Sequence, residues 1–438
     1  MASTRITRTL SANGDKKLTI SAWIKRGNIS VAQYICRVFS DGNNQGGLYF
    51  TSGDNIEWFD YVGGAYKLRY ITNAVYRDTG AWMHILAHFD NSLSSPEAKL
   101  YVNGVEQSLS TSTNYTQNQT TSWNNNYTFD IGSAATGTYF DGSMTHFYFI
   151  QNQKYAPTTF GETDSTSGIW KPITSPTIDY SATGSNSCLL KFENSGNMDL
   201  DSGSNNLSFT TSGTLTQNVD TPSNNFATMN PLAMGTASSN HTFSNGNLTS
   251  TNSSSTHRSV VSSLAVSSGK WYFEGKSVST GGAYPTFGIF NADASFDAGT
   301  YFTSTANGYG YNSNGAIFNN ANSLVTGLAT WTDGDIIGVA LDVDNDKIYF
   351  SKNGSWQNSA DPSAGTGGQS ITSDITWYFA GHTNDGGTDP VQNYNFGQGY
   401  FGTTAVASAG TAPSEGGIFE FDCPNGYQAL CTKGINSF

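Results

Sequence analysis

Carboxylates are the groups with which this sequence could carry out hydrolysis. A glycoside hydrolase needs two carboxyl groups on one side of its site, about 5 Å apart for a retaining enzyme. On a strand they would be two Glu residues at alternating spacing with Asp between them. None of the eight Glu residues has such a partner, and Glu162 and Asp164 lie in a polar turn. We therefore expect no catalytic residue and no enzyme. The Glu residues are Glu57, Glu97, Glu106, Glu162, Glu193, Glu274, Glu415 and Glu420.

Residues that could hold a metal are scattered along the chain. Asp342–Asp346 is an acidic loop, but an EF-hand calcium loop needs Gly at its sixth position and Glu at its twelfth. Lys347 and Asn353 occupy those positions, so we expect a hairpin turn instead. His84 and His88 share one face of a predicted strand, which suits a metal pair or an ordinary polar surface. We expect no metal and no cofactor.

Aromatic residues near predicted turns are the remaining candidates for a binding site. Sugar rings present C–H faces that pack on Trp and Tyr, while Asn and Asp bond the hydroxyl groups. The same side chains could equally pack in a core or an interface. The candidates are Trp58, Tyr61 and Tyr66 around one turn, Tyr115 and Trp123 in the polar segment 108–126, and Tyr284, Tyr301 and Trp356 near later turns.

The composition predicts an all-β protein. Aromatic residues reach 13%, only 12% of residues are charged, and no stretch shows a useful helical period. Short strands with polar turns between them fit such a sequence. The net charge is −13, with 20 Lys and Arg against 33 Asp and Glu, and no basic stripe is present. We therefore expect no binding to nucleic acid through phosphates.

The sequence shows no clear targeting signal, and its cysteine spacing does not indicate a metal site. The first residues, MASTRITRTLSANGDKK, are basic but lack an apolar core, so they predict no secretory signal. No run approaches 18 apolar residues, so we expect no membrane span. The cysteines lack CxxC spacing, and the last two could pair across a hairpin or remain free thiols. They are Cys36, Cys188, Cys423 and Cys431.

The first 165 residues contain alternating apolar runs that predict the strands of a sandwich. WMHILAHFD at 82–90, KLYVNGV at 99–105 and FDG at 140–142 resemble motifs of the concanavalin A-like sandwich of the laminin-G/pentraxin kind. That resemblance implies a rim where Asp residues and backbone carbonyls hold Ca²⁺. The matching positions are Asp90, Asn91 and Asp141, which could also be ordinary loop-capping residues.

The C-terminal part, residues 236–438, carries four motifs in order. DGDIIGVALDVDNDKIYFSKNGSW at 333–356 predicts a buried hairpin. Together with GKWYFE at 269–274, GYGY at 308–311 and NFGQ at 395–398, it resembles the SPRY (B30.2-like) sandwich. The predicted fold is therefore two antiparallel β-sandwiches, a concanavalin A-like jelly roll and then a SPRY-like sandwich. An irregular bridge over 166–235 joins them, and an insertion near 402–420 could be a contact arm.

This arrangement of domains resembles uncharacterised proteins of marine bacteriophages, taken to be virion surface or tail-fibre components. The resemblance implies a non-enzymatic virion protein, made in the host cytoplasm and displayed on the capsid or tail for adhesion to host-surface glycans. The expected partners are other virion proteins, and several copies or a homo-oligomer are expected. A purely structural assembly module and a glycan-degrading enzyme with an unrecognised site remain as alternatives.

Overall fold

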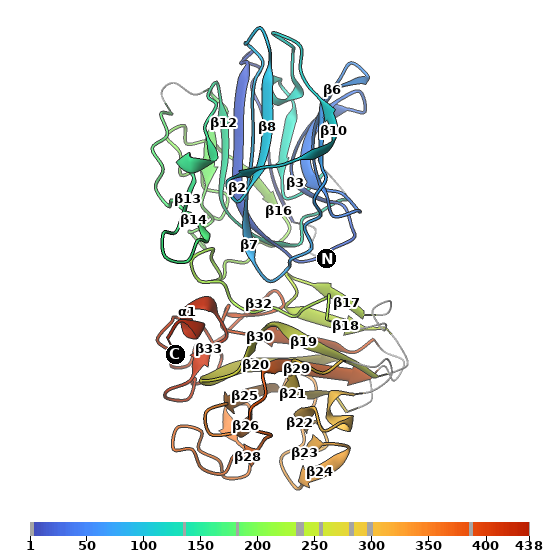
Figure 1. Ribbon diagram of the computed structural model, residues 1–438, viewed down its shortest axis with the longest axis vertical. Coiled ribbons are helices and arrows are strands. Elements are labelled where there is room, and N and C mark those ends of the chain that lie inside the picture. Colours follow the sequence, from blue (N-terminus) through green and yellow to red (C-terminus); the bar gives the residue numbers. More distant parts are fainter. Residues whose placement is uncertain are drawn as a thin grey trace. The chain divides into compact units, whose positions relative to one another are not determined.

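The computed structural model describes residues 4–134, 137–180, 184–233, 241–253, 257–279, 284–295, 301–384 and 389–437. Strands dominate this part of the chain, and helices are limited to single turns, which confirms the all-β prediction (Figure 1). The chain forms two compact units, unit 1 over residues 1–217 and unit 2 over residues 218–438. No helix among the described residues is long and apolar enough to cross a membrane.

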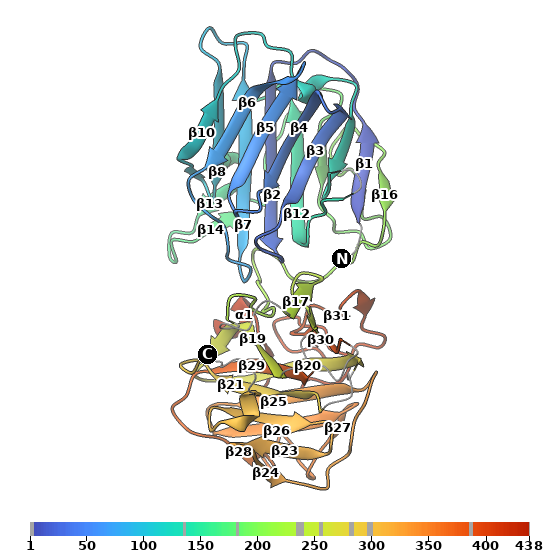
Figure 2. The same cartoon turned by 90° about the vertical axis from the view of Figure 1, so that its right-hand side faces the viewer.

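Unit 1 is a sandwich of two antiparallel sheets, as predicted (Figure 2). One sheet has eight strands, in the order β10 (Leu109–Thr113), β6 (Ala65–Thr72), β5 (Ile56–Val62), β4 (Asn44–Phe50), β3 (Gln33–Asp41), β11 (Thr128–Ile131), β1 (Arg5–Thr9) and β16 (Thr210–Ser212). The other has six, in the order β15 (Cys188–Leu190), β12 (Gly142–Gln151), β2 (Lys17–Arg26), β7 (Trp82–Asp90), β8 (Glu97–Val102) and β9 (Val105–Glu106).

The core of unit 1 lies between these two sheets, because alternate side chains of each strand point inward. Trp58 of β5 is fully buried and packs against Tyr70 of β6 and Phe89 of β7. Trp123, in a 3₁₀ turn at Ser122–Asn124, is also fully buried. Its indole lies over Gly46, where a Cβ would come within 2.9 Å of the ring.

A buried carboxylate ties the 3₁₀ turn to the sheet. Asp60 of β5 points into the core and accepts hydrogen bonds from the backbone N–H of Ser122 (3.1 Å) and the hydroxyl of Tyr115 (3.0 Å). Burial raises the pKa of Asp60 to about 7, although these hydrogen bonds lower it in part. The folded unit therefore holds a proton at Asp60 more tightly than the unfolded chain does.

We predict that Asp60→Asn changes the pH dependence of stability. The stability that protonated Asp60 contributes is complete below its unfolded pKa of 3.8 and is lost as the pH rises through about 7. The amide side chain of the variant stays neutral at every pH, so it does not lose this stability as the pH rises. The variant should therefore gain more than about 1 kcal/mol over the wild type between pH 4 and pH 8, at about 1.4 kcal/mol for each pKa unit. Urea unfolding followed by Trp fluorescence at both pH values measures the free energy of unfolding of each protein. The prediction is contradicted if the difference between variant and wild type is the same at pH 4 and pH 8.

The predicted bridge is divided between the two units. Its first part joins unit 1, because β14 (Trp170–Pro172) pairs with β13 (Gly161–Thr163), β15 pairs with β12 and β16 pairs with β1. Its described second part belongs to unit 2, where Phe226 and Met229 are fully buried in hydrophobic clusters. Residues of the range 166–235, predicted as an irregular bridge packed on both sandwiches, thus supply strands and core side chains to the two units.

Unit 2 is also a sandwich of two main sheets. One has β17 (His241–Ser244), β18 (Thr249–Asn252), β30 (Val391–Asn395), β20 (Lys270–Ser279), β25 (Ile336–Asp342), β26 (Lys347–Lys352) and β27 (Ser355–Trp356), with β28 (Gln369–Ser370) on β26 and β33 (Gln428–Ala429) on β20. The other has β19 (His257–Val266), β29 (Trp377–Asn384), β21 (Thr286–Asn291), β22 (Gly308–Asn312), β23 (Ala316–Asn319) and β24 (Asn322–Val325).

The predicted hairpin at 333–356 is β25 and β26, and β25 is buried along its whole length. The GKWYFE, GYGY and NFGQ motifs fall on β20, on β22 and at the end of β30. A small ladder of β31 (Tyr400–Phe401) and β32 (Thr404–Ala405) follows, and a short α-helix, α1, spans Thr432–Ile435.

The C-terminal segment of unit 2 covers the outer side of its larger sheet. Phe419, Tyr427 and Ala429 pack on Tyr272 and Tyr349 of that sheet. Glu274 of β20 accepts hydrogen bonds from the backbone N–H groups of Glu420 (2.8 Å) and Phe421 (2.9 Å). The end of the predicted contact arm 402–420 is thus anchored to its own unit. Cys423 and Cys431 are buried free thiols.

We predict that Glu274→Ala loosens this segment more than Glu274→Gln does. Alanine leaves two buried N–H groups without an acceptor, at about 1–3 kcal/mol each. Glutamine keeps one acceptor oxygen at the same place. Limited proteolysis should cut within residues 402–421 faster in the alanine variant, and urea should unfold unit 2 earlier. Equal behaviour of the two variants would show that Glu274 does not anchor the segment.

Candidate ligand-binding face

The outer side of the eight-stranded sheet carries three rows of paired residues. Alternation on each strand sends one set of side chains into the core and the other set outward. The middle row runs across the strands as Thr7, Asp130, Arg37, Gly47, Phe59 and Arg69. The row on one side contains Thr128, Phe39, Gln45, Tyr61 and Tyr66, and that on the other contains Tyr34, Tyr49, Glu57 and Ile71.

Six rings on β3, β4, β5 and β6 form what we call the aromatic face, namely Tyr34, Phe39, Tyr49, Phe59, Tyr61 and Tyr66. Tyr34 stacks on Tyr49 with ring centroids 4.5 Å apart and an interplanar angle of 6°. Phe59 meets the rings of Tyr49 and Tyr66 edge-on, at 6.0 and 6.2 Å. Tyr61 lies 4.9 Å from Tyr66. These strands face the viewer in Figure 2, where no other strand lies over them.

Two bulges put Tyr34 and Tyr66 on this face. The pairing of β3 with β4 shifts between Tyr34 and Cys36, and the pairing of β5 with β6 shifts between Asp60 and Tyr61. Strict alternation back from inward-facing Cys36 and Leu68 would turn both tyrosines toward the core. An extra residue in a strand reverses the side on which the following side chain emerges. Each bulge therefore adds one ring to the aromatic face.

Gly47 makes room for the rings at the centre of the face. A Cβ at this position would lie 2.7 Å from ring atoms of both Phe59 and Tyr34. The two rings therefore lean over the glycine from neighbouring strands. As a result Phe59 is only 6% exposed although it is on the outer side of the sheet.

An ion pair fixes one end of the face. Glu57 accepts hydrogen bonds from Arg69 Nε (2.8 Å) and from the hydroxyl of Tyr49 (2.7 Å). The Arg69 guanidinium lies over the ring of Tyr66, 4.6 Å from its centroid. The hydrogen bond to Glu57 raises the pKa of Arg69, and burial raises the pKa of Tyr49. This network holds a phenol, a guanidinium and a ring in fixed positions.

The other end of the face is built around Arg37. Its guanidinium lies 4.0 Å from the centroid of Phe39 and donates from Nη2 to Gln45 Oε1 at 2.7 Å. Asp130 is its cross-strand neighbour on β11, but the ion pair of Asp130 is with Arg5, at 3.7 Å. Burial against the rings lowers the pKa of Arg37, which still remains a cation at physiological pH.

The chemistry of this face suits binding of a ring with polar edges. Aromatic side chains supply flat apolar surfaces, and the charged groups beside them can bond hydroxyl groups. Glu57 and Asp130 are three strand spacings apart, about 14 Å. A hydrolytic pair of carboxyl groups is closer, at about 5–9.5 Å. These two acids therefore do not form such a pair.

The structure corrects three of the predicted ligand-binding residues. Trp58, Trp123 and Tyr115 are buried in the core of unit 1, and they cannot stack on a ligand outside it. Trp58 points inward because alternation on β5 gives the outer positions to its neighbours Glu57 and Phe59. Tyr61 and Tyr66, in contrast, lie on the aromatic face, and Tyr66 is 41% exposed.

The rim that the resemblance implies for Ca²⁺ stays a prediction, and its residues have protein partners in this structure. The Asp90 carboxylate accepts hydrogen bonds from the backbone N–H and the hydroxyl of Ser92, and it lies 3.7 Å from Lys17 Nζ. Asn91 is fully buried and donates to the Gln119 carbonyl. The backbone carbonyl of Asp141 accepts from Gly27 N–H. Within the described ranges, no three His, Cys, Asp or Glu side chains come together to hold a metal ion.

His84 and His88 lie on the outer side of the six-stranded sheet, where later segments cover them. Trp170 Nε1 donates to His84 Nδ1 (3.2 Å), and His84 Nε2 is 2.8 Å from the Ser21 hydroxyl. Burial lowers the pKa of His84 to about 3. His88 Nδ1 is bonded to the Tyr155 carbonyl at 2.7 Å. Both imidazoles therefore bond to segments that cover this sheet.

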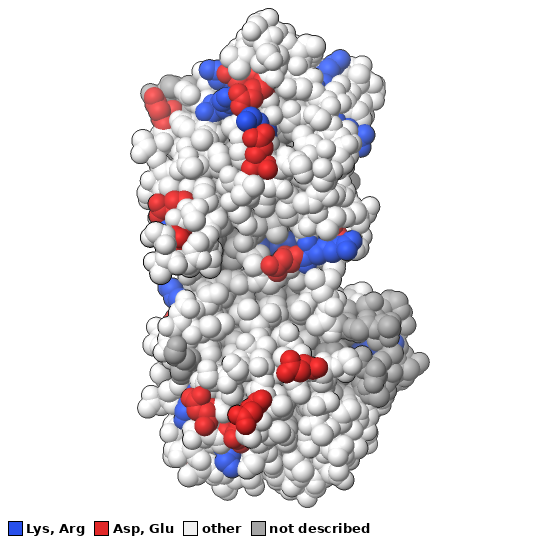
Figure 3. Space-filling model, viewed as in Figure 1, with Lys and Arg blue, Asp and Glu red and all other residues white. Residues whose placement is uncertain are grey.

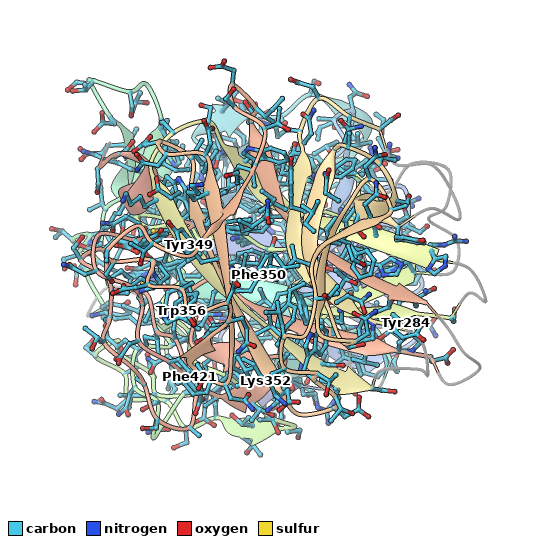
Figure 4. All side chains as sticks on the ribbon, turned by 90° about the horizontal axis from the view of Figure 1, so that it is seen from below. Tyr284, Tyr349, Phe350, Lys352, Trp356 and Phe421 are labelled. Atoms are coloured by element: carbon cyan, nitrogen blue, oxygen red, sulfur yellow. The ribbon has the colours of Figure 1, made fainter. Side chains whose placement is uncertain are left out.

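The predicted residues of unit 2 do not form one site. Tyr284 is 63% exposed, and Figure 4 shows it far from Trp356. Trp356 is half-buried against Tyr272, with ring centroids 6.3 Å apart. Tyr301 contacts the rings of His257 and His382, which are hydrogen-bonded to each other at 2.9 Å.

The sequence reading missed most of the aromatic face. Its residues Tyr34, Tyr49 and Phe59, and its charged neighbours Arg37 and Arg69, were not among the candidates. A signal was present at 37–39 and 57–61, because Arg37 and Phe39, and likewise Glu57, Phe59 and Tyr61, stand at every second position. That spacing places the residues of each strand on one side of the sheet.

Each half of the chain matches a family model. Residues 3–153 match the concanavalin A-like lectin/glucanases superfamily, and residues 270–362 match the SPRY domain. The chain therefore carries a concanavalin A-like domain followed by a SPRY domain, as the motifs had indicated. Both are binding-type domains, which indicates a binding module. A comparison with curated proteins finds no match.

Solved structures similar to this chain include members of both domain types. The SPRY domain of human HERC1 is 19% identical, with a TM-score of 0.30 over 38% of this chain and 96% of that one. The heptameric SAP-like pentraxin from Limulus polyphemus is 15% identical, with a TM-score of 0.26 over 34% and 70%. The TRIM65 PSpry domain is 9% identical, with a TM-score of 0.27 over 38% and 89%.

We predict that Gly47→Ala disturbs the aromatic face. The added methyl group meets Tyr34 and Phe59 at 2.7 Å, so these rings must move, at a cost of about 1–3 kcal/mol. The near-UV circular dichroism of the tyrosines should change, and the thermal midpoint of unit 1 should fall. Gly42→Ala is the matched control in the same hairpin, since a Cβ there meets nothing within 4 Å. Similar effects of both substitutions would argue against the packing described.

Proposed function

We propose that this protein is a non-enzymatic adhesion protein of a phage virion surface, and that it binds host-surface glycans through the aromatic face of unit 1. The observation that carries the proposal is the row structure of that face. Six rings lie on four adjacent strands, and fixed charged groups stand at both ends. Sugar rings can stack on the aromatic side chains while their hydroxyl groups bond to the charged ones.

The size of the face supports binding to an extended chain of sugars. From Arg37 to Arg69 the middle row crosses three strand spacings, about 14 Å. Rings occupy part of both neighbouring rows over this distance, namely Phe39, Tyr61 and Tyr66 in one row and Tyr34 and Tyr49 in the other, so sugars at several points can meet an aromatic surface. Tyr66 is the most exposed of these rings and offers the first contact.

The virion location rests on the resemblance of the domain order to phage surface and tail-fibre proteins. Charged side chains are sparse on the side of the molecule shown in Figure 3, as they are in the composition as a whole. Such an uncharged polar surface suits display of many copies. Unit 2 would attach the protein to other virion proteins, and Val278 and Tyr284 are exposed side chains available for that contact.

We predict that Tyr66→Ala weakens binding to host cells and to the glycans selected on a glycan array. Loss of one stacked ring removes about 1 kcal/mol, or about fivefold in Kd. Tyr284→Ala removes a more exposed ring from unit 2, 63% against 41%, and should bind as the wild type does. Unchanged binding by the Tyr66 variant, with weaker binding by the Tyr284 variant, would move the glycan site to unit 2.

Phage particles that lack this protein distinguish the adhesion role from a purely structural role in assembly. Particles without this protein should assemble but fail to adsorb to host cells. Unassembled particles, together with no glycan binding by the purified protein, would contradict the adhesion role. Shortened polysaccharide chains after incubation with the protein would contradict its non-enzymatic character.

A further inference from the structure

One arginine of the aromatic face, Arg37, has no carboxylate as an ion-pair partner among the described residues. Three arginines and two acids take part in the ion pairs and ring contacts on the outer side of this sheet. Arg69 pairs with Glu57 at 2.8 Å, and Arg5 pairs with Asp130 at 3.7 Å. Arg37 is the remaining arginine, and no carboxylate of the described residues lies within 4.0 Å of its guanidinium.

Arg37 also retains unused hydrogen-bond donors. A guanidinium carries five N–H groups, of which Arg37 uses one for Gln45 Oε1. Its Nε is buried without a hydrogen-bond partner. A neutral amide oxygen at one corner does not compensate the charge, and partial burial against the ring of Phe39 strengthens any new electrostatic contact. Asp130 acts on this charge from the neighbouring strand but makes no hydrogen bond to it, so the guanidinium keeps donors for an added anion.

The distribution of charge between the two units is consistent with an anion binding to unit 1. Unit 1 has 14 Lys and Arg against 17 Asp and Glu, whereas unit 2 has 6 against 16. Most of the net negative charge is therefore in unit 2. Unit 1 is therefore close to neutral, so its surface repels an anion far less than that of unit 2 does.

We propose that the aromatic face takes an acidic glycan, and that Arg37 binds the carboxylate or sulfate group of a sugar stacked beside it. Arg37 pairs with Gly47 across the strands, and the rings of Tyr34 and Phe59 lean over that glycine. A sugar packed on these rings can present a ring substituent to the planar fork of the guanidinium, which matches a two-oxygen acceptor. This inference rests on the proposed function and narrows its ligand class.

Matched polymers test the charge requirement. Dextran sulfate against dextran isolates the sulfate, and polygalacturonate against its methyl ester isolates the carboxylate. We expect the full-length protein to bind at least one acidic member at least tenfold more tightly than its neutral partner. This preference should shrink as salt increases, because the guanidinium is partly exposed. Which acidic polymer binds distinguishes the two anions.

Substitutions of Arg37 test whether this residue binds the acidic group. Arg37→Gln should weaken binding to the acidic polymer about tenfold, and Arg37→Lys should recover part of it because charge remains without the fork geometry. Lys99→Gln, the same charge change on the six-stranded sheet, should bind as the wild type does. Unchanged near-UV circular dichroism and thermal midpoint confirm that each variant is folded.

Two results would overturn the inference. One is equal binding of neutral and acidic polymers by the wild type; the other is binding by Arg37→Gln that matches the wild type. If binding then remains sensitive to Tyr66→Ala, the adhesion role stands with a neutral ligand. If the protein binds no polymer, no arrayed glycan and no host cell, the proposed function fails together with the inference.

Discussion

Strand register is the constraint on which the outer surface of unit 1 depends. A slip of one residue would exchange the inner and outer sets of side chains on a strand, since they alternate. The inner set holds Trp58 and Leu48, which are fully buried, and this burial keeps the register fixed. The aromatic face is thus a product of core packing on the opposite side of the same strands. The bulges near Tyr34 and Tyr66 then add two rings that regular alternation would hide.

In both units, buried carboxylates attach irregular segments of the chain to the regular sheets. Asp60 holds the 3₁₀ turn at 122–124, and Glu274 holds the chain at 420–421. Asp54 does the same near the β4–β5 turn, where it pairs with Arg26 and Arg77 at 2.8 Å each. Loops have backbone N–H groups that no neighbouring strand satisfies, and a buried acid accepts them.

Much of the fold could be predicted from the sequence, because it follows from local patterns. The hairpin at 333–356 and the strand at 82–90 are alternating or apolar runs between turn residues, and the structure has strands at both places. The candidate site was harder to predict. Trp58 and Phe59 are neighbours of similar character, and only the partner sheet decides which one is buried. The bulge at Tyr34 depends on pairing with β4 and leaves no mark in the residues themselves. Short strands of the bridge such as β14 and β16 were not predicted, because they become visible only through their partners.

The way in which each sandwich is closed has a consequence for how the chain folds during synthesis. Unit 1 pairs its first strand, β1, with β16 at residues 210–212, so all of its sheet strands exist before most of unit 2 is translated. Domains made first generally fold first. Unit 2 requires Phe419 to Cys431 to cover the sheet formed by β20 and β25, so its apolar surface remains open until these residues have been translated. Each sandwich must therefore be protected from aggregation until its own closing segment has left the ribosome.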